Sequence, residues 1–164
     1  MSVLLCQDIK IEHLQSLVNH YGLTLEIIND NQPIPGSFWQ PPEAGLIRDT
    51  LYLRNDTPVH SALHETCHYI CMDKERRKTL DTDAGGRTAI EEDSVCYLQI
   101  LLSEFIPEMK QPRMFSDMDE WGYSFRLGSS NAWFENDAED AQSWLQQHQI
   151  IERDNQITKK LRIN

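Results

Sequence analysis

The sequence has no apolar run near the ~18 consecutive residues that a membrane-spanning helix requires. It is also poor in basic residues: 15 Lys and Arg stand against 26 Asp and Glu, which gives a formal net charge of -11 at pH 7. An acidic surface repels phosphate backbones and anionic lipids, so neither nucleic acids nor membranes are expected as partners. The four cysteines show no Cys-x-x-Cys spacing, and we expect free thiols rather than a disulfide framework.

The first residues carry a brief apolar run, 3–6, without the basic and longer apolar regions of a secretory signal. We therefore expect a cytoplasmic protein. A length of 164 residues, with 40% hydrophobic and 25% charged residues, suits one domain, residues 1–164, that buries its own core. The last ten or so residues are polar and are expected to fray. The sequence does not indicate an oligomeric state.

Hydrophobic periodicity and turn residues predict an α+β arrangement. Two strands, 23–28 and 46–54, are expected on either side of a loop rich in proline and glycine. The predicted helices span residues 8–21, 58–71, 88–104, 116–127 and 136–151. Gly22 and Gly128 are expected to end the first and fourth of these helices, and a charged connection, 72–87, separates the second from the third.

One stretch, His64-Glu65-x-x-His68, matches the His-Glu-x-x-His pattern of zinc peptidases. Thr57 is a good N-cap and Pro58 suits the first helical position, so local chemistry places the motif inside a helix. With about 3.6 residues per turn, residues four apart share one face. His64 and His68 can therefore bind one metal ion with Glu65 beside it.

The predicted motif helix divides into two faces. Residues of core type form one stripe: Val59, Leu63, Cys67 and Ile70. Polar residues form the other: His60, His64, Glu65 and His68. This division predicts packing on the core through one side and a cleft on the other. His60 lies two turns before His68 and is too far along the helix to share its metal ion.

A catalytic zinc site with two histidines needs a third protein ligand and keeps one position for water. The first turn of the second long helix offers Glu91, Glu92 and Asp93. Glu91 lies 23 positions after His68, enough for a helix end, a turn and a return. It also lies three positions after Thr88, where it would complete a capping box instead. The residues alone leave the choice of ligand open.

Residues 46–107 resemble the gluzincins, zincin metallopeptidases in which the motif is followed some twenty residues later by a ligand glutamate on a downstream helix. In several gluzincins this glutamate has a small residue at +3, which fits Glu91 and Ser94. Val95 stands at +4, where several families carry an acidic or amide residue that supports a histidine. Small ImmA/IrrE-type members place an aromatic residue at +6 and leucines at +10 and +11. The residues found there are Tyr97, Leu101 and Leu102.

The resemblance implies a minimal zincin-like α+β fold, with a small mixed sheet packed beside the motif helix and a second long helix. It also implies a Zn2+ cofactor held by His64, His68 and Glu91, with Glu92 as a rival third ligand. Glu65 would then be the catalytic general base in peptide-bond hydrolysis by zinc-activated water. No other cofactor is expected.

Further expectations concern the substrate, a peptide or protein. In zincins the strand before the motif helix commonly pairs with an extended substrate, which assigns this role to residues 51–54. The oxyanion of the tetrahedral intermediate needs a hydrogen-bond donor besides the metal, and Tyr123 and Arg126 are the candidates.

Two alternatives stay open. The first is a catalytically inactive zinc-binding regulatory or interaction protein of the same fold, in which Cys71 or Glu92 closes the site as a fourth ligand. The second is a helical domain without metal, in which the motif is coincidental.

Overall fold

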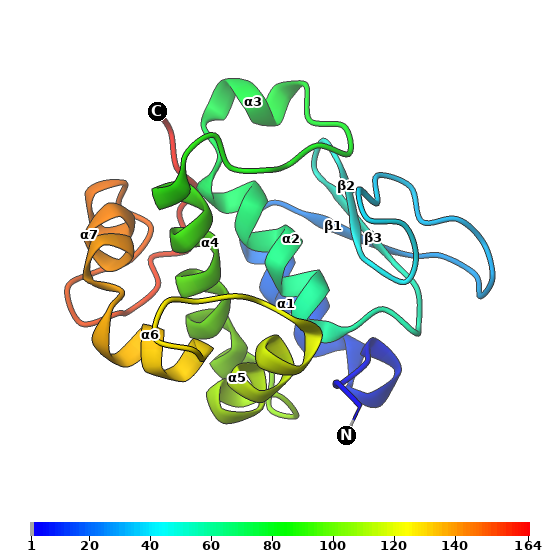
Figure 1. Cartoon of the computed structure of the whole chain (residues 1–164). Coiled ribbons are helices and arrows are strands. Elements are labelled where there is room, and N and C mark those ends of the chain that lie inside the picture. Colours follow the sequence, from blue (N-terminus) through cyan, green and yellow to red (C-terminus); the bar gives the residue numbers. More distant parts are fainter. Residues whose placement is uncertain (1) are drawn as a thin grey trace.

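A computed structural model describes residues 2–164 of the chain (Figure 1). Within this range the architecture is α+β, with seven α-helices and a small three-stranded sheet. The strands are β1 (Thr24–Ile27), β2 (Gly45–Ile47) and β3 (Thr50–Leu53). The helices are α1 (Ile11–His20), α2 (Val59–Cys71), α3 (Lys74–Lys78), α4 (Ala89–Leu102), α5 (Lys110–Trp121), α6 (Ser130–Asn136) and α7 (Glu139–Gln147), with 3-10 turns at Cys6–Asp8 and Ser103–Phe105. None of the helices in this range is both long and apolar enough to cross a bilayer.

The sheet is mixed and has the strand order β1-β3-β2, with β1 parallel and β2 antiparallel to β3. The single strand expected at 46–54 is therefore wrong, because this segment forms a hairpin. Arg48, at the turn, has a left-handed backbone with φ +49°, which ends β2 and lets the chain reverse. Central β3 is hydrogen-bonded on both sides. The expectation that residues 51–54 pair with an extended substrate is also wrong, because this strand has no free edge.

The motif helix, α2, begins at Val59, directly after Pro58. The expected cap, Thr57, acts differently, because its hydroxyl accepts a hydrogen bond from the backbone N–H of Arg54 (2.9 Å). This bond closes the turn that joins β3 to α2. The helix was therefore predicted in the right place, although the N-cap side chain was assigned wrongly.

The two faces of α2 meet different surroundings because the helix lies between the sheet and α4 (Figure 1). The core stripe is confirmed, and its four members are fully buried: Val59, Leu63, Cys67 and Ile70. On the other face His60 and His68 are buried as well, whereas His64 and Glu65 are partly exposed. Of these four polar residues, only the first two of the motif thus keep exposed surface.

The second long helix, α4, packs against α2 on one side and α7 on the other. Its N-cap is confirmed, since the hydroxyl of Thr88 accepts a hydrogen bond from the N–H of Glu91 (3.2 Å). Ser94 is fully buried and donates to the carbonyl of Ala141 in α7 (3.4 Å). This small residue therefore serves the contact between α4 and α7.

The last helices differ from the expected bounds. The helix expected at 116–127 is α5, which begins earlier and ends at Gly122 rather than Gly128. Both glycines have a positive φ, and a helix ends at the first glycine that adopts the left-handed conformation, here Gly122 with φ +102°. The pattern at 136–151 corresponds to the shorter α7.

The segment 72–87, expected as a plain connection, contains α3. Its N-cap is Asp73, whose carboxylate accepts a hydrogen bond from the N–H of Arg76 (2.9 Å). The short helix thereby fixes the backbone from which the Arg76 side chain reaches α4.

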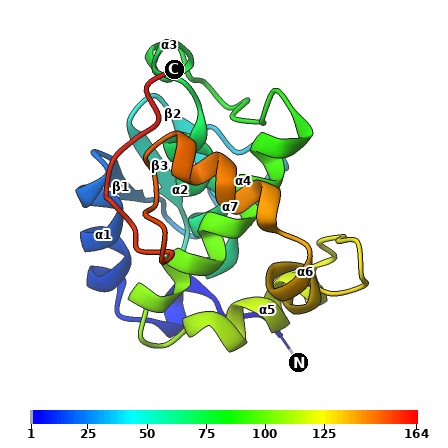
Figure 2. The same ribbon diagram turned by 90° about the vertical axis from the view of Figure 1, so that its left-hand side faces the viewer.

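The C-terminal segment is docked on the helices, so the expected fraying is wrong. It ends beside α3, as Figure 2 shows. The N–H of Arg162 donates to the carbonyl of Ile70 (3.0 Å), and the N–H of Lys74 donates to the carbonyl of Ile163 (2.9 Å). The Arg162 guanidinium also lies over the Trp144 ring, 5.1 Å from its centroid. Polar composition does not predict such contacts, because they depend on distant parts of the chain.

Candidate metal centre

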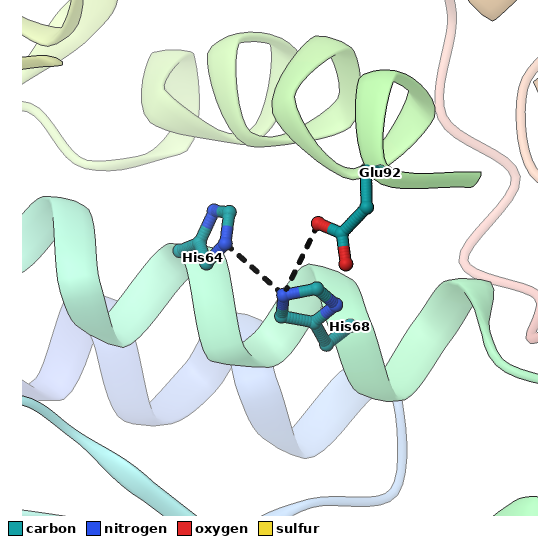
Figure 3. Close-up of side chains that lie close together, drawn as sticks. All are labelled: His64, His68 and Glu92. Atoms are coloured by element: carbon teal, nitrogen blue, oxygen red, sulfur yellow. Dashed lines mark hydrogen bonds and ion pairs between the residues drawn. The ribbon is translucent and has the colours of Figure 1, made fainter. Parts of the chain in front are cut away.

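The two motif histidines project from neighbouring turns of α2 toward one point (Figure 3). Their Nε2 atoms lie 3.0 Å apart, and the rings meet at 89° with centroids 4.5 Å apart. The helical spacing of four residues produces this approach, because it stacks His68 above His64 on one face. The expected pair of nitrogen ligands is therefore brought together.

The third group at this point is Glu92, which extends from the first turn of α4 toward His68 (Figure 3). Its Oε2 lies 3.8 Å from His68 Nε2. The ligand atoms of His64, His68 and Glu92 all lie within 4.8 Å of one another. The other carboxylate oxygen, Oε1, accepts a hydrogen bond from the N–H of Gly86, which fixes the carboxylate in place.

Glu91, the expected third ligand, is not part of this cluster. It is 2% exposed, and its carboxylate oxygens lie 3.0 and 3.1 Å from Arg76 Nη1. Arg162 Nη1 adds a further contact to Glu91 at 3.1 Å. Consecutive helical residues point about 100° apart, so only one of the two glutamates can face α2 at this position. The side chain that faces α2 is that of Glu92, the alternative ligand in the sequence prediction, whereas Glu91 forms ion pairs with Arg76 and Arg162.

Gln99 orients the ring of His64. Its amide N–H donates to the carbonyl of His60 (3.1 Å), which can only accept, so the amide oxygen faces His64 Nδ1 at 2.7 Å. His64 Nδ1 therefore carries the proton and Nε2 presents its lone pair to the cluster. Gln99 was not predicted from the sequence. Its spacing of seven residues from Glu92 places both on the same face of α4, which is the signal that indicates it.

The outer nitrogen of His68 lacks such support. Its Nδ1 is buried and has no hydrogen-bond partner among residues 2–164. The His68 ring is therefore hydrogen-bonded only through Nε2, which lies 3.0 Å from His64 Nε2.

The cluster suits a divalent zinc ion. Burial lowers the pKa values of His64 and His68, so both rings are neutral at pH 7, the form that binds metal. Two ligands on a tetrahedral zinc ion, each at about 2.0–2.1 Å, are about 3.3 Å apart, close to the 3.0 Å between the two nitrogens. Two imidazoles and one carboxylate are also a ligand set that zinc enzymes use. Among residues 2–164 no fourth side chain of ligand type converges with these three.

Glu65 lies beside the cluster on the same helix. It lines a pocket of about 200 Å³ together with His64, His68 and Glu92. Burial, and to a smaller extent the carboxylates of Glu43 and Glu92, raises the pKa of Glu65 to about 8. A cation bound beside Glu65 would lower this pKa, because it favours the ionised carboxylate. Glu65 is therefore placed to exchange a proton near neutral pH.

A larger cleft of about 610 Å³ opens next to His64 and Glu65. The Pro-rich loop, which carries Trp39 and Glu43, lines it together with Ser61 of α2 and residues 121–123 at the end of α5. The loop contributes its residues 39–43 to the wall of the cleft.

The two oxyanion candidates occupy different places. Tyr123 lines the cleft with its ring edge-on to His64, the centroids 5.6 Å apart. Its hydroxyl contacts His60 Nδ1 (3.2 Å) and Gln99 Nε2 (3.4 Å). Arg126 is exposed, does not line the cleft and is bound to Asp137. Only Tyr123 is near the metal ligands.

Comparisons with known proteins add no relative. No protein-family description, no curated protein and no solved structure gives a significant match to the chain.

Proposed function

We propose that the protein is a zinc metallopeptidase of the gluzincin type, with a zincin-like fold and Glu65 as the general base. One observation carries the proposal: His64, His68 and Glu92 converge within 4.8 Å while Glu65 stands beside them at an open cleft. A chance occurrence of the motif would not need a carboxylate from another helix at this point.

Each residue has a role that follows from its position. His64, His68 and Glu92 would hold zinc, which supplies a Lewis acid that acidifies water and polarises a carbonyl group. Gln99 keeps the lone pair of His64 directed at the cluster. Glu65 takes the proton from the attacking water and delivers it to the leaving nitrogen.

The number of ligands supports a hydrolase over the inactive zinc-binding alternative. Structural zinc sites are closed by four protein ligands, whereas catalytic sites keep a position open. Glu92 serves as the third ligand here rather than the fourth, and Cys71 is buried outside the cluster. A site of three ligands next to a cleft leaves room for water and substrate.

The substrate is proposed to be a peptide or protein that lies in the 610 Å³ cleft. Strand addition to β3 or β2 is not its binding mode, because β3 is central and the outer edge of β2 is covered. At that edge the N–H of Leu46 donates to the carbonyl of Gly36 (3.2 Å), and the carbonyl of Leu46 accepts from the N–H of Thr82 (2.9 Å). The peptide is held instead by side chains of the cleft walls.

We also propose that the protein acts in the cytoplasm. A reducing compartment suits its unpaired thiols. The free cysteines are Cys6, Cys67, Cys71 and Cys96.

Cleavage of a mixed library of internally quenched peptides by zinc-loaded protein tests the proposal. Glu65→Gln should lower kcat by about 100- to 10,000-fold, the usual contribution of a general base, while zinc stays bound at one ion per chain. Glu26→Gln, an exposed position on β1, is the matched control and should leave kcat unchanged. Equal cleavage by the Glu65→Gln variant and the wild type, or no cleavage by zinc-loaded protein, would overturn the proposal.

A further inference from the structure

Two tryptophans are exposed at the cleft beside Glu65, although they come from distant parts of the sequence. Trp39, in the Pro-rich loop, is 73% exposed, and Trp121, at the end of α5, is 43% exposed. Trp39 is braced by Phe38 in an edge-to-face contact with the ring centroids 5.0 Å apart. Large aromatic surfaces left in water at a concave site indicate contact with a ligand.

A carboxylate lies between these aromatic segments. Glu43 Oε1 accepts a hydrogen bond from Trp121 Nε1 (2.8 Å), and its Oε2 accepts one from the Ser61 hydroxyl. Ser61 Oγ in turn accepts a hydrogen bond from the N–H of Ala44 (3.0 Å), which ties the loop to α2. The position of the carboxylate is therefore fixed by the loop, by α2 and by the end of α5.

The charge of Glu43 is uncompensated. Both of its hydrogen-bond donors are neutral, and each carboxylate oxygen keeps a further lone pair. No lysine or arginine lines the cleft in the part of the chain that the structure describes, and its only acidic side chains are those of Glu43 and Glu65. With a net charge of -11 around it, the cleft attracts cations and repels carboxylates.

We propose that Trp39, Trp121 and Glu43 form a subsite for a cationic side chain of the bound peptide, arginine in preference to lysine. A cation over the face of tryptophan gains the strongest of the cation–π contacts, and a guanidinium is planar, stacks and forms charge-assisted bonds with a carboxylate. The inference rests on the proposed function, because it takes this cleft as the place of the peptide. It adds the chemical class of residue that the protein selects.

Peptide binding tests the subsite apart from hydrolysis. The probes are acetylated and amidated alanine pentapeptides with one central residue: arginine, lysine, norleucine or glutamate. Their dissociation constants are measured by calorimetry on the zinc-loaded, full-length Glu65→Gln protein. The arginine peptide should bind about tenfold more tightly than the norleucine peptide, which has a similar stem without charge. The glutamate peptide should bind most weakly, and 1 M salt should reduce the arginine preference.

Two variants test whether Glu43 and Trp39 cause the preference for the arginine peptide. Glu43→Gln keeps the size and an acceptor for Trp121 but removes the charge, so the arginine and norleucine peptides should then bind about equally. Trp39→Leu should reduce the arginine preference by about threefold, the share of one stacking face. Trp39 is too exposed for this change to affect folding. Glu26→Gln and Phe105→Leu, at exposed positions outside the cleft, are the matched controls and should retain the full preference.

The outcomes separate the subsite from the peptidase. Equal binding of the arginine and norleucine peptides, or an arginine preference that survives Glu43→Gln, would overturn the subsite even if the zinc-loaded wild type cleaves peptides. Binding of none of the peptides would also overturn it. An arginine preference lost in Glu43→Gln would support the subsite even if no peptide is cleaved, in which case only the proposed hydrolysis fails.

Discussion

Exchanging the two adjacent glutamates of α4 for glutamine should give opposite phenotypes. Glu92→Gln removes a proposed zinc ligand that is partly exposed at the cluster, so zinc affinity should fall while the metal-free fold stays stable. Glu91→Gln removes the carboxylate that holds Arg76 and Arg162, so stability should fall while zinc binding survives. Each variant is the matched control for the other, because the two changes are chemically identical.

The magnitudes follow from burial. Removing one partner of a buried ion pair costs about 3–5 kcal/mol, because the remaining charge is left without compensation. Arg76 and Arg162 are partly exposed, and Arg76 keeps its hydrogen bond to the Gly85 carbonyl, which places Glu91→Gln near the lower figure, about 3 kcal/mol. Loss of Glu92 should weaken zinc binding by more than about 100-fold, since loss of an outer hydrogen-bond partner already costs 10- to 100-fold.

The assays are urea unfolding of chelator-treated protein for stability and competition with a chromogenic chelator for zinc affinity. The reasoning is refuted if Glu91→Gln abolishes zinc binding while Glu92→Gln retains it. It is also refuted if Glu91→Gln leaves the free energy of unfolding unchanged, because the ion pairs with Arg76 and Arg162 would then contribute nothing.

Three further predictions concern supporting residues. Gln99→Leu removes the acceptor for His64 Nδ1 and should weaken zinc binding by about 10- to 100-fold. Gln99→Glu keeps an acceptor and should not weaken zinc binding. Equal zinc affinities of the two variants in the chelator competition would contradict this prediction. Arg162→Ala should lower the free energy of unfolding in urea by about 2 kcal/mol, because it removes an ion pair to Glu91 at a buried site; a freely frayed tail would give no change. Burial, and secondarily His64, lowers the pKa of His60 to about 3, so the folded metal-free protein binds fewer protons than the unfolded chain between pH 6.5 and 3. The contribution of His60 to the free energy of unfolding should therefore be complete above pH 6.5 and fall by roughly 1 kcal/mol per pH unit below it. Urea unfolding at a series of pH values should show a smaller slope for His60→Gln than for the wild type. The same slope in both proteins would contradict this prediction.

Local patterns were enough to predict the motif helix. Pro58 and the stripe from Val59 to Ile70 specify a helix with one buried face, and the spacing of His64 and His68 specifies their convergence. These features depend on residues within a few turns of one another. The sequence therefore predicts them without knowledge of the packing.

Which glutamate joins His64 and His68 depends on how two helices cross. Glu91 and Glu92 are equally acidic neighbours, and the rotation of α4 against α2 decides which one faces His68. That rotation is set by packing along the whole of α4, including its contact with α7. The presence of two arginines near Glu91 comes from α3 and the C-terminal segment, which the sequence alone does not place together.

Two further features differ from the sequence predictions: the hairpin at residues 46–54 and the docked C-terminal segment. The turn at Arg48 and Asp49 lacks glycine and proline, so residues 46–54 read as one strand. The polar tail read as frayed because its partners, Ile70 and Glu91, lie far away in the sequence. Pairing between β2 and β3 decides the first feature, and contacts with distant residues decide the second; local composition records neither.

An anomalous-scattering map of zinc-loaded crystals, with the zinc content of the same preparation, tests the central claim most directly. The account predicts one zinc ion per chain, about 2.0–2.2 Å from His64 Nε2, His68 Nε2 and a Glu92 oxygen, with no fourth protein ligand. Absence of bound zinc, or a zinc ion ligated by Glu91 or closed off by Cys71, would contradict it.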